Sequence, residues 1–593
     1  MFKNPLLVSH QEIIWQDGMP YSKIFNDRYF QKNALDEIEN VFIEPNNLRE
    51  KFTKQNYILV GELGFGLGIN FLYSLKIWIE SKKLPFSHFD FVSIEKYLPT
   101  PAQVAKAASL FPELNDVTKL FLEYYQPVHN GLIKINLKEL RASLILINAD
   151  VIDAFDYLKT NHSKIDAWFL DGFDPKQNPE MWTSEIVAEI KKSSKIDSSF
   201  GTYTSSGLVK KSFLENDIGF QRVAGFNKRH KLIGRINSGQ RISNSRGSKR
   251  VAIIGSGIAA AGAVHALKKF DLKCDVFEQS SQLHSGASGN DAAALYPKFQ
   301  LNNSPLNRFL VQSYFYAYQE MLQFPNSFFP TKAWFFGMND RTKQWINAVN
   351  TNPDFKLFSS IKDEIDDSLK AYAEMNSEFL MGAYLKPRSL IEEIFANSKI
   401  EIRFQHELVN IEQQADVSRL FFSNGFNDDY DFVILAMGKG LSNWISNLQI
   451  SKGHIIGVPK GFVSRIQYPI HHRGYVLPPI GNYVWMGSTY EHEYFDLRPS
   501  REQILTILED QRVFIEDSDI SIEEIKVRAS ERVSRSNKFP IAGKLKGKEN
   551  VFAIGALGSR GFSSSFLCGD VIANQIMGGF IPLDYEVMDN LNC

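Results

Sequence analysis

The feature that most constrains this chain is a glycine turn near its middle. The segment Val251–Gly262 reads Val-Ala-Ile-Ile-Gly-Ser-Gly-Ile-Ala-Ala-Ala-Gly, an apolar strand, a tight turn and a helix of small residues. In such a βα unit Gly255 makes the turn, Gly257 lets the backbone approach a pyrophosphate, and Ala260 permits close packing of helix on strand. The next apolar run ends on Glu278, which is placed to accept a hydrogen bond from a ribose hydroxyl. The pattern predicts a doubly wound α/β domain with a dinucleotide site; the alternative is a glycine turn in an ordinary βα unit.

Length and composition set the limits for the rest of the chain. With 593 residues the chain is too long for one core, so about two to four folding units are expected. A dinucleotide fold usually begins near an N-terminus, so the long segment before this turn predicts a separate unit. The net charge of −1 gives no global sign of a polyanionic partner, so any nucleic-acid surface must be a local patch.

The number and spacing of the cysteines and histidines argue against structural disulfides and metal sites. Cys274, Cys568 and Cys593 are odd in number, far apart and form no CxxC motif. The pair His471-His472 has no carboxylate or cysteine at ligand spacing, so no metal site is expected. The N-terminus has no basic-then-apolar signal pattern, and no apolar run is long enough to span a bilayer. We therefore expect a cytoplasmic protein without membrane contact.

A second glycine-rich turn lies in the first third of the chain. An apolar run from Tyr57 reaches the acid Glu62 and is followed by glycines at every second position, Gly64, Gly66 and Gly68. A helix with one apolar face follows them. This spacing differs from the dinucleotide pattern, so it predicts a different nucleotide-like ligand.

Three further strands support a ligand site beside this turn. Their apolar runs end near Glu95, Asp150 and Asp171. Because ligands of open α/β sheets bind beyond the carboxyl ends of the strands, we expect these acids and Glu62 to converge on one crevice. A single acid in such a place is more often a helix cap or a solvated loop residue.

The alternating glycines resemble motif I of class I methyltransferases that use S-adenosylmethionine. The loop from Phe169 to Thr183, Phe-Leu-Asp-Gly-Phe-Asp-Pro-Lys-Gln-Asn-Pro-Glu-Met-Trp-Thr, resembles the methyltransferase half of the bifunctional enzymes that make 5-methylaminomethyl-2-thiouridine in tRNA (the MnmC family). The resemblance implies a Rossmann-like fold, Glu95 on the ribose, Asp150 on the adenine and Asp171 as the catalytic residue. That family usually has Ala where Asp174 stands, which would change the charge beside the reactive centre.

A basic stretch joins the two halves. Between residues 221 and 250 the chain carries no Asp or Glu but many Lys and Arg, with Ser-Gly and Gly-Ser pairs. We expect a solvated linker over residues 236–249. We expect Lys228, Arg229 and Lys231 to contact tRNA phosphates, because basic side chains that neutralise the phosphate backbone bind RNA independently of its sequence.

Three separated fragments of the second half identify its dinucleotide as FAD. They resemble segments of the FAD proteins related to D-amino-acid oxidase and glycine oxidase. The first fragment is His284–Tyr296, and the second is the buried strand that ends at Gly438. The third fragment opens a helix near the C-terminus, whose amide-bearing N-terminus would favour negative charge on the reduced ring. The resemblance implies that the cofactor-binding residues of these fragments are Ser288, Gly289, Asn290, Gly438, Gly558, Ser559, Arg560 and Gly561.

Arg532 is the candidate substrate residue of this half. It lies eight residues before Pro540, the spacing of the arginine that binds the substrate carboxylate in glycine-oxidase-like proteins. A guanidinium pairs with a carboxylate through two parallel hydrogen bonds, which favours Arg over Lys. The alternative is a surface salt bridge. The same family usually has Arg-Asp where Ser536 and Asn537 stand.

Together these patterns predict a bifunctional tRNA wobble-uridine enzyme. We expect a methyltransferase domain over residues 1–235 and an FAD-dependent oxidoreductase domain over 250–593, with an antiparallel substrate subdomain at roughly 300–400 and 450–520. The resemblance implies that the FAD half removes a carboxymethyl group from 5-carboxymethylaminomethyl-uridine and that the first half methylates the amine. One alternative is a fused oxidase and N-methyltransferase for a small amine; another is a non-catalytic tRNA-binding protein. Two fused catalytic halves make a monomer sufficient.

Overall fold

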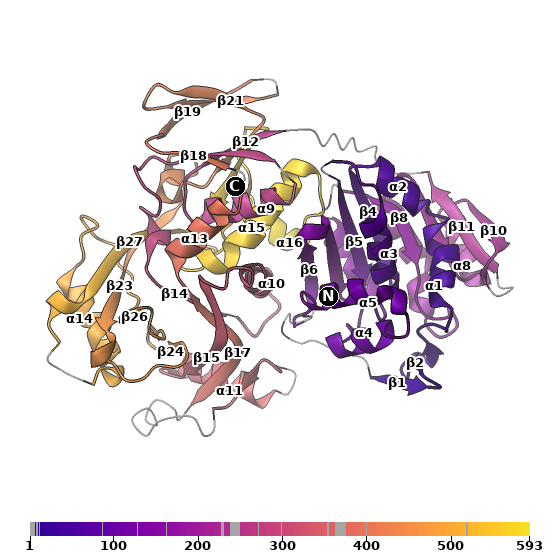
Figure 1. Ribbon diagram of the computed structural model, residues 1–593, viewed down its shortest axis with the longest axis horizontal. Coiled ribbons are helices and arrows are strands. Elements are labelled where there is room, and N and C mark those ends of the chain that lie inside the picture. The colour runs from indigo at the N-terminus through magenta and orange to yellow at the C-terminus, as the bar shows by residue number, and fades with distance from the viewer. Residues whose placement is uncertain are drawn as a thin grey trace.

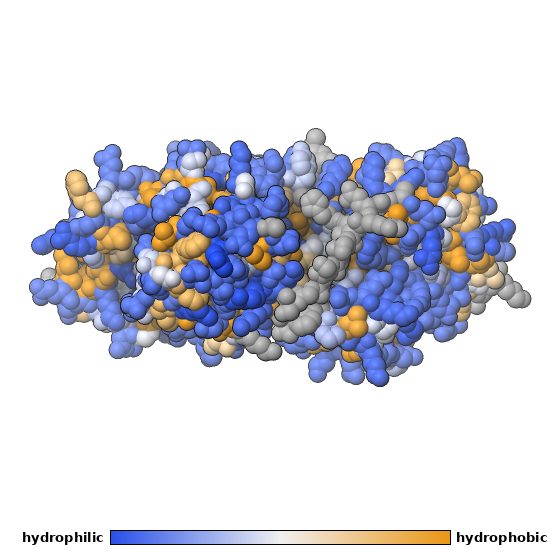
Figure 2. Space-filling model, turned by 90° about the horizontal axis from the view of Figure 1, so that it is seen from above, coloured by the Kyte–Doolittle hydropathy of each residue, from blue (hydrophilic) through white to orange (hydrophobic). Residues whose placement is uncertain are grey.

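The computed structural model consists of two α/β halves that lie side by side (Figure 1). It describes residues 6, 10, 12–85, 87–126, 128–159, 161, 163–226, 230–237, 249–270, 272–297, 299–352, 355–361, 375–398, 400–414, 416–516 and 520–593. None of the described helices is long and apolar enough to cross a membrane. The described part of the chain also has no group of three or more His, Cys, Asp or Glu side chains arranged around a metal position. Figure 2 shows hydrophobic residues in separate groups on a largely hydrophilic face.

The first half is built on an eight-stranded sheet in the order β10-β11-β9-β8-β4-β5-β7-β6. The pairs β4–β5, β4–β8, β5–β7 and β8–β9 are parallel, whereas β6 and the pair β10–β11 are antiparallel to their neighbours. The strands are β4 (Tyr57–Leu63), β5 (His88–Ile94), β6 (Gly131–Leu137), β7 (Ala142–Asn148), β8 (Ile165–Leu170), β9 (Ser194–Thr202), β10 (Phe220–Ala224) and β11 (His230–Ile236).

Helices cover both faces of this sheet because its central strands are apolar on both sides. Along β4, Ile58 and Val60 face one core, while Leu59 and Leu63 face the other. The first core is covered by α1 (Ala34–Ile38), α2 (Leu48–Lys54), α3 (Ile69–Glu80), α4 (Pro101–Ala108) and α5 (Asn115–Leu122). The second is covered by α6 (Val151–Lys159), α7 (Ser184–Ser193) and α8 (Gly207–Glu215).

A small N-terminal sheet completes the first half. It comprises β1 (Ile13–Gln16), β2 (Met19–Ser22) and β3 (Asp27–Arg28). Asp17 and Gly18 join β1 to β2 with positive φ angles of 51° and 77°, as a two-residue hairpin turn requires. β1 and β2 therefore form a tight hairpin.

The second half contains the expected mainly parallel sheet, in the order β18-β13-β12-β22-β29-β28, in which the edge strand β28 is antiparallel to β29. Its strands are β12 (Arg250–Ile254), β13 (Lys273–Phe277), β18 (Ile400–Arg403), β22 (Phe432–Leu435), β28 (Ile541–Lys544) and β29 (Val551–Gly555). One face packs against α9 (Ile258–Lys268), α10 (Pro305–Met321), α13 (Pro387–Ala396), α15 (Gly561–Met577) and α16 (Tyr585–Leu591). The other face packs against the three-stranded sheet β19 (Leu408–Gln413), β20 (Ser418–Phe422) and β21 (Asn427–Tyr430).

A nine-stranded sheet forms the substrate subdomain. It is antiparallel except for one parallel pair, β15–β24, so the expected antiparallel sheet is in fact mixed. Its strands are β14 (Ala293–Leu295), β15 (Phe328–Phe336), β16 (Phe358–Ser359), β17 (Asn376–Leu385), β23 (Gln449–Pro459), β24 (Ile470–His471), β25 (Tyr475–Val476), β26 (Tyr483–Gly487) and β27 (Lys526–Ser534). The helices α11 (Asp340–Thr351) and α14 (Arg501–Asp510) pack against it.

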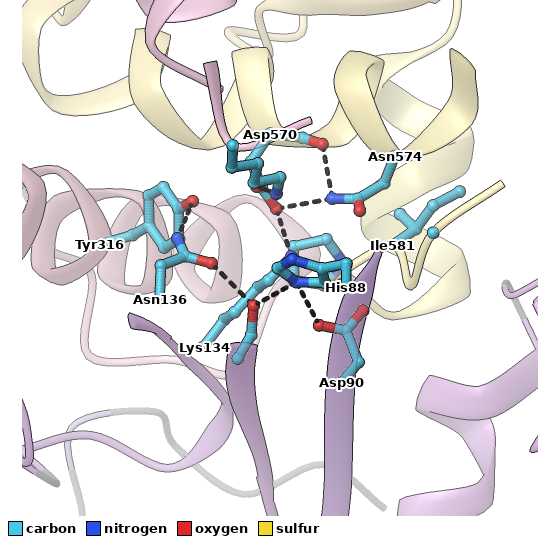
Figure 3. A network of polar contacts seen from close by, with 12 residues as sticks. His88, Asp90, Lys134, Asn136, Tyr316, Asp570, Asn574 and Ile581 are labelled. Atoms are coloured by element: carbon cyan, nitrogen blue, oxygen red, sulfur yellow. Dashed lines mark hydrogen bonds and ion pairs between the residues drawn. The ribbon is translucent and has the colours of Figure 1, made fainter. Parts of the chain in front are cut away.

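The two halves meet where the edge strand β6 faces α10 and α15, and this contact contains buried charge. Lys134 on β6 lies 2.9 Å from Asp570 on α15, and Lys269 contacts the other oxygen of Asp570. Asn136 donates to Tyr316 and to Glu320 on α10, at 2.7 and 2.8 Å. Figure 3 shows Lys134 and Asn136 of the first half reaching toward Asp570 and Tyr316 of the second.

Apolar and backbone contacts extend the same interface. Phe580, from the second half, is fully buried within an apolar core of the first half. Beside it, Asn161 exchanges two hydrogen bonds with the backbone of Ile581, at 3.1 and 2.5 Å. Because these contacts hold backbone as well as side chains, the two halves pack as parts of one structure.

The electrostatics of the interface depend on Asp570. Burial alone would raise the pKa of this carboxyl, but Lys134 and Lys269 outweigh burial and hold its pKa below the usual range. Asp90 on β5 lies near the same two lysines and is 1% exposed. Two lysines therefore face two carboxylates in a region without solvent, where loss of one partner leaves an unpaired charge.

We expect Asp570→Asn to destabilise the protein, because Lys134 and Lys269 would both lose the carboxylate with which they pair in a buried region. Removing one partner of a buried ion pair costs about 3–5 kcal/mol. Thermal unfolding followed by circular dichroism should show a clearly lower midpoint. Asp496→Asn, which breaks the exposed pair of Asp496 with Arg498, is the control and should leave the midpoint in place. Equal midpoints for the two variants would contradict the importance of the buried pair.

Candidate active sites

The glycine loop of the first half has the backbone that the sequence predicts. Gly64, Gly66 and Gly68 have φ angles of +85°, +55° and +77°, which residues with a side chain rarely adopt. The amide of Gly66 donates to Glu95 at 2.9 Å, and the second oxygen of Glu95 accepts from the amide of Tyr97. Glu95 therefore holds the loop from behind.

A cavity of about 520 Å³ opens in front of this loop. Three segments provide its walls: the N-terminal sheet with α1, the glycine loop, and the turn after β8. The lining residues are Tyr21, Asn26, Asp27, Arg28, Tyr29, Phe30, Gln31, Ala34, Glu37, Ile38, Phe42, Gly64, Phe65, Gly66, Leu67, Ile69, Asn70, Asp171, Gly172 and Tyr203. Of the four predicted acids only Asp171 lines the cavity.

A chain of hydrogen bonds connects Asp171 to the interior. Asn70, in the first turn of α3, donates to Asp171 at 2.9 Å and to Glu62 at 2.8 Å. Glu62 also accepts from the hydroxyl of Ser93 at 2.6 Å. Burial raises the pKa of Asp171 to about 7 and that of Glu62 to about 8, although the hydrogen bonds from Asn70 lower both. Sequence reasoning did not single out Asn70, because nothing in the spacing showed that it joins two acids.

An aromatic cluster joins Tyr29 of the cavity lining to the turn that follows Asp171. Phe173 stacks on Phe25 with ring centroids 4.6 Å apart, and the edge of Tyr29 lies 5.2 Å from the same ring. The hydroxyl of Tyr203 is buried and has no hydrogen-bond partner in the described structure. A buried hydroxyl is normally satisfied, so this one indicates a polar ligand in the cavity.

Asp150 and Asp174 do not line the cavity, although the amide of Asp174 donates to Asp27 of the lining at 3.1 Å. Asp150 forms a partly exposed ion pair with Lys96 at 2.9 Å. Asp174 is exposed and accepts from the amide of Lys176, so it caps its own turn.

The predicted phosphate contact of Lys231 is not supported. Lys231 is only 6% exposed, and its ammonium donates to the carbonyl and side-chain oxygens of Asn40 at 2.5 and 3.0 Å. The alternation of β11 turns this side chain inward, and burial lowers its pKa. Lys228 and Arg229 lie outside the described residues.

The turn that opens the second half has no room for side chains. A Cβ on Gly255, whose φ is +107°, would lie 2.4 Å from the carbonyl of Ala436. The amide of Ile258, at the start of α9, donates to the hydroxyl of Ser288 at 3.0 Å. Ala260 is fully buried, and Gly262 permits a further close contact between helices, because a Cβ there would lie 2.4 Å from the carbonyl of Ser565 on α15.

Glu278 lies at the end of β13, as predicted. It is 5% exposed and accepts from the hydroxyl of Ser256, in the glycine turn, at 2.5 Å. Its second oxygen accepts from the amide of Ser280 at 2.9 Å. The carboxylate is thus fixed beside the turn in the position that a ribose would require.

Two arginines hold the loop that contains the next predicted residues. Arg388 donates to the carbonyl of Gly289 at 2.7 Å, and Arg528 donates to the side chain of Asn290 at 3.1 Å. A Cβ on Gly289 would lie 2.0 Å from the carbonyl of His284. The loop is therefore held closely from both sides.

The remaining predicted residues lie at the same end of the sheet. Gly438 follows β22 with a φ of +55°, and Gly558 follows β29 with a φ of +57°. Ser559 and Arg560 then lead into α15, where Gly561 packs against Ile258. The N-termini of α9 and α15 are thus neighbours at the carboxyl ends of the parallel strands.

Arg532 lies on β27, opposite Ser451 of β23. Its guanidinium donates to the carbonyl of Thr489 at 3.3 Å and lies 4.8 Å above the ring of Tyr490. No carboxylate in the described structure lies within ion-pair distance of Arg532. The alternative of a surface salt bridge is therefore not observed.

The neighbouring Arg535 has a different environment. It donates to the carbonyls of Phe539, Pro540 and Asn592, at 3.3, 2.9 and 2.9 Å. These bonds tie the loop after β27 to the C-terminus. Asn537 accepts from the amide of Phe539 at 3.1 Å, so this departure from the family pattern serves the same loop. Tyr490, whose ring lies under Arg532, is a residue that the sequence did not single out as part of a site.

The fold and these sites define a two-part enzyme, with a flavin-type dinucleotide fold following a methyltransferase-type fold. The chain belongs to the FAD dependent oxidoreductase family, whose model matches residues 250–575. Residues 112–237 match the model of S-adenosyl-L-methionine-dependent methyltransferases. The cofactors of the two halves are accordingly FAD and S-adenosylmethionine.

Several relatives of this chain are named as bifunctional proteins. A protein of Idiomarina loihiensis, named tRNA 5-methylaminomethyl-2-thiouridine biosynthesis bifunctional protein MnmC, is 28% identical over 97% of both chains. A Marinomonas protein of the same name is 33% identical over 51% of this chain and 47% of its own. A glycine oxidase from Geobacillus kaustophilus covers 58% of this chain and 98% of its own, at 17% identity and a TM-score of 0.48.

The residues present fit both cofactors. In the second half the turn at Gly255 leaves no space for a side chain, and the buried Glu278 keeps lone pairs for a hydroxyl. In the first half the glycine loop borders a cavity that contains the unpaired hydroxyl of Tyr203. Each half therefore has polar groups that a bound nucleotide would satisfy.

We expect Glu278→Ala to weaken FAD binding by at least about tenfold, since a hydrogen bond to a charged group contributes about 1.5–3 kcal/mol. Titration of FAD into the apoprotein, followed by flavin fluorescence, measures the affinity. Glu401→Ala on the neighbouring strand β18 removes a more exposed carboxylate paired with Arg403 and is the matched control. Undiminished affinity in the Glu278 variant would remove this residue from the site.

Proposed function

We propose that the chain modifies the wobble uridine of tRNA in two consecutive steps. The FAD half would remove the carboxymethyl group of 5-carboxymethylaminomethyl-(2-thio)uridine and leave a primary amine. The first half would then methylate that amine to 5-methylaminomethyl-(2-thio)uridine. The observation that carries this proposal is the near full-length similarity to relatives with that named role, together with an unpaired arginine in the FAD half.

Arg532 would select the substrate of the first step. The carboxymethylaminomethyl group is a glycine attached through nitrogen, and a guanidinium binds its carboxylate through two hydrogen bonds. Tyr490 under the guanidinium would limit its movement. FAD, when bound, accepts a hydride. Loss of hydride from the methylene carbon gives a C=N bond, and water adds to that bond and releases glyoxylate.

Asp171 would orient the acceptor of the second step. Methyl transfer is an in-line displacement, so the amine needs a lone pair that points at the methyl group. An ionised Asp171 would accept a hydrogen bond from the amine and favour loss of its proton. S-adenosylmethionine, when bound, supplies the methyl group. The order follows, because only the product of the oxidation carries a primary amine.

We also propose that the remaining residues predicted from the sequence contact the cofactors. Those of the second half, introduced above, would contact FAD, and those of the first half would contact S-adenosylmethionine. In the first half these are Glu62, Gly64, Gly66, Gly68, Glu95 and Asp150, with Glu62 and Glu95 acting from behind the loop. The division of the chain at residues 236–249, a monomeric state and a cytoplasmic location are likewise proposals. The alternative function, oxidation and methylation of a small amine, is favoured by the inward orientation of Lys231, which removes one expected RNA contact.

Two variants test the order and the roles together. Purified protein is incubated with S-adenosylmethionine and with tRNA that carries 5-carboxymethylaminomethyl-uridine, and the nucleosides are separated by mass spectrometry. We expect Asp171→Asn to stop at 5-aminomethyl-uridine, with methylation lowered by about 10²-fold or more. We expect Arg532→Lys to leave most of the starting nucleoside unchanged, because an ammonium does not form the paired contact.

Asp116→Asn provides the matched control, since Asp116 is exposed on α5 and does not line the cavity. It should give the fully methylated product. Accumulation of a methylated nucleoside that still carries the carboxymethyl group would reverse the proposed order. If the protein without substitutions does not change the nucleoside, the proposed function is wrong and the small-amine alternative remains.

A further inference from the structure

A second cavity, of about 390 Å³, lies on the substrate subdomain and has a positive lining. We call it the cationic pocket. Its lining residues are Asp291, Lys386, Arg388, Ser389, Ile480, Gly481, Asn482, Tyr483, Trp485 and Lys526. Three cations thus face one carboxylate, in a protein whose net charge is −1.

The two lysines of the cationic pocket keep their charge available. Lys526 lies 4.3 Å from the ring centroid of Tyr483, and Lys386 lies 5.2 Å from that of Phe329. Neither ammonium is within ion-pair distance of a carboxylate in the described structure. A ring under an ammonium fixes its position without neutralising it, so both charges remain for an anionic ligand.

The third cation, Arg388, links the cationic pocket to the loop that contains Gly289, which is one of the proposed FAD contacts. Arg388 donates to the carbonyl of Gly289 at 2.7 Å, while its nearest carboxylate, Asp291, is 3.9 Å away. The side chains of a strand alternate, so Lys526 and Arg532 lie on the same face of β27. Six residues of strand separate them by about 20 Å.

That separation indicates what the cationic pocket would bind. A free amino acid held at Arg532 is too short to reach Lys526. A polynucleotide carries phosphates on both sides of the base that enters the site, and lysines bind phosphates as point charges. We propose that the cationic pocket binds a backbone phosphate of the RNA substrate, outside the uridine that enters the flavin site. This inference rests on the proposed function.

The double variant Lys386→Gln/Lys526→Gln tests the proposal. Flavin reduction by tRNA bearing 5-carboxymethylaminomethyl-uridine is measured at several salt concentrations, and so is tRNA binding by filter retention. We expect KM and Kd for tRNA to rise about tenfold or more, with kcat unchanged. The slope of log Kd against log salt should fall by about one, since the loss of one phosphate contact removes about 0.7–0.9.

The control is Lys544→Gln/Lys546→Gln, which removes two exposed lysines of the same half. It should leave both the affinity and the salt slope near their original values. Unchanged tRNA affinity in the pocket variant would overturn the proposal, as would an equal loss in the control. A lower kcat with an altered flavin spectrum would also overturn it, because the lysines would then act on the flavin site.

Failure of the proposed function gives a different result. In that case the unmodified protein does not oxidise this tRNA, whatever the state of the cationic pocket. The binding measurement still decides the inference, because a phosphate contact changes Kd and its salt slope without turnover. Loss of affinity in the pocket variant would then support an RNA site, and equal affinity would overturn it.

Discussion

The arrangement of the two halves depends on one buried carboxylate, Asp570. It lies on α15 between Lys134 of the first half and Lys269 of the second. The N-terminus of the same helix borders the glycine turn of the FAD half, since Gly561 packs against Ile258. One helix therefore connects the flavin site to the interface, and the charges beside it make separation of the halves costly. The two proposed sites are held in a fixed relation by this packing.

Local sequence predicted the parts of each site that local geometry determines. Gly64, Gly66 and Gly68 have left-handed backbone, Gly255 leaves no space for a side chain, and Glu278 ends its strand beside the turn. These positions depend on a strand, a turn and a helix that are close in the chain. The glycine pattern was therefore sufficient to place them.

Contacts between distant segments were not predictable in this way. Asn70 joins Glu62 to Asp171, which is distant in sequence, and the N-terminal sheet provides a wall of the cavity far from its own place in the chain. The edge strand β6 was not foreseen, although it carries the interface. Lys231 belongs to a basic stretch, but the pairing of β11 with its neighbours turns the side chain toward Asn40. In each case tertiary packing decides the role of the residue.

The central claim is that one chain converts a carboxymethylaminomethyl group to a methylaminomethyl group on the wobble uridine. The most direct test expresses this chain in cells that lack their own enzyme for these steps, followed by mass spectrometry of the tRNA nucleosides. The account predicts that 5-methylaminomethyl-uridine appears as 5-carboxymethylaminomethyl-uridine declines. Unchanged levels of 5-carboxymethylaminomethyl-uridine, with a stable flavin-loaded protein in the cells, would contradict it.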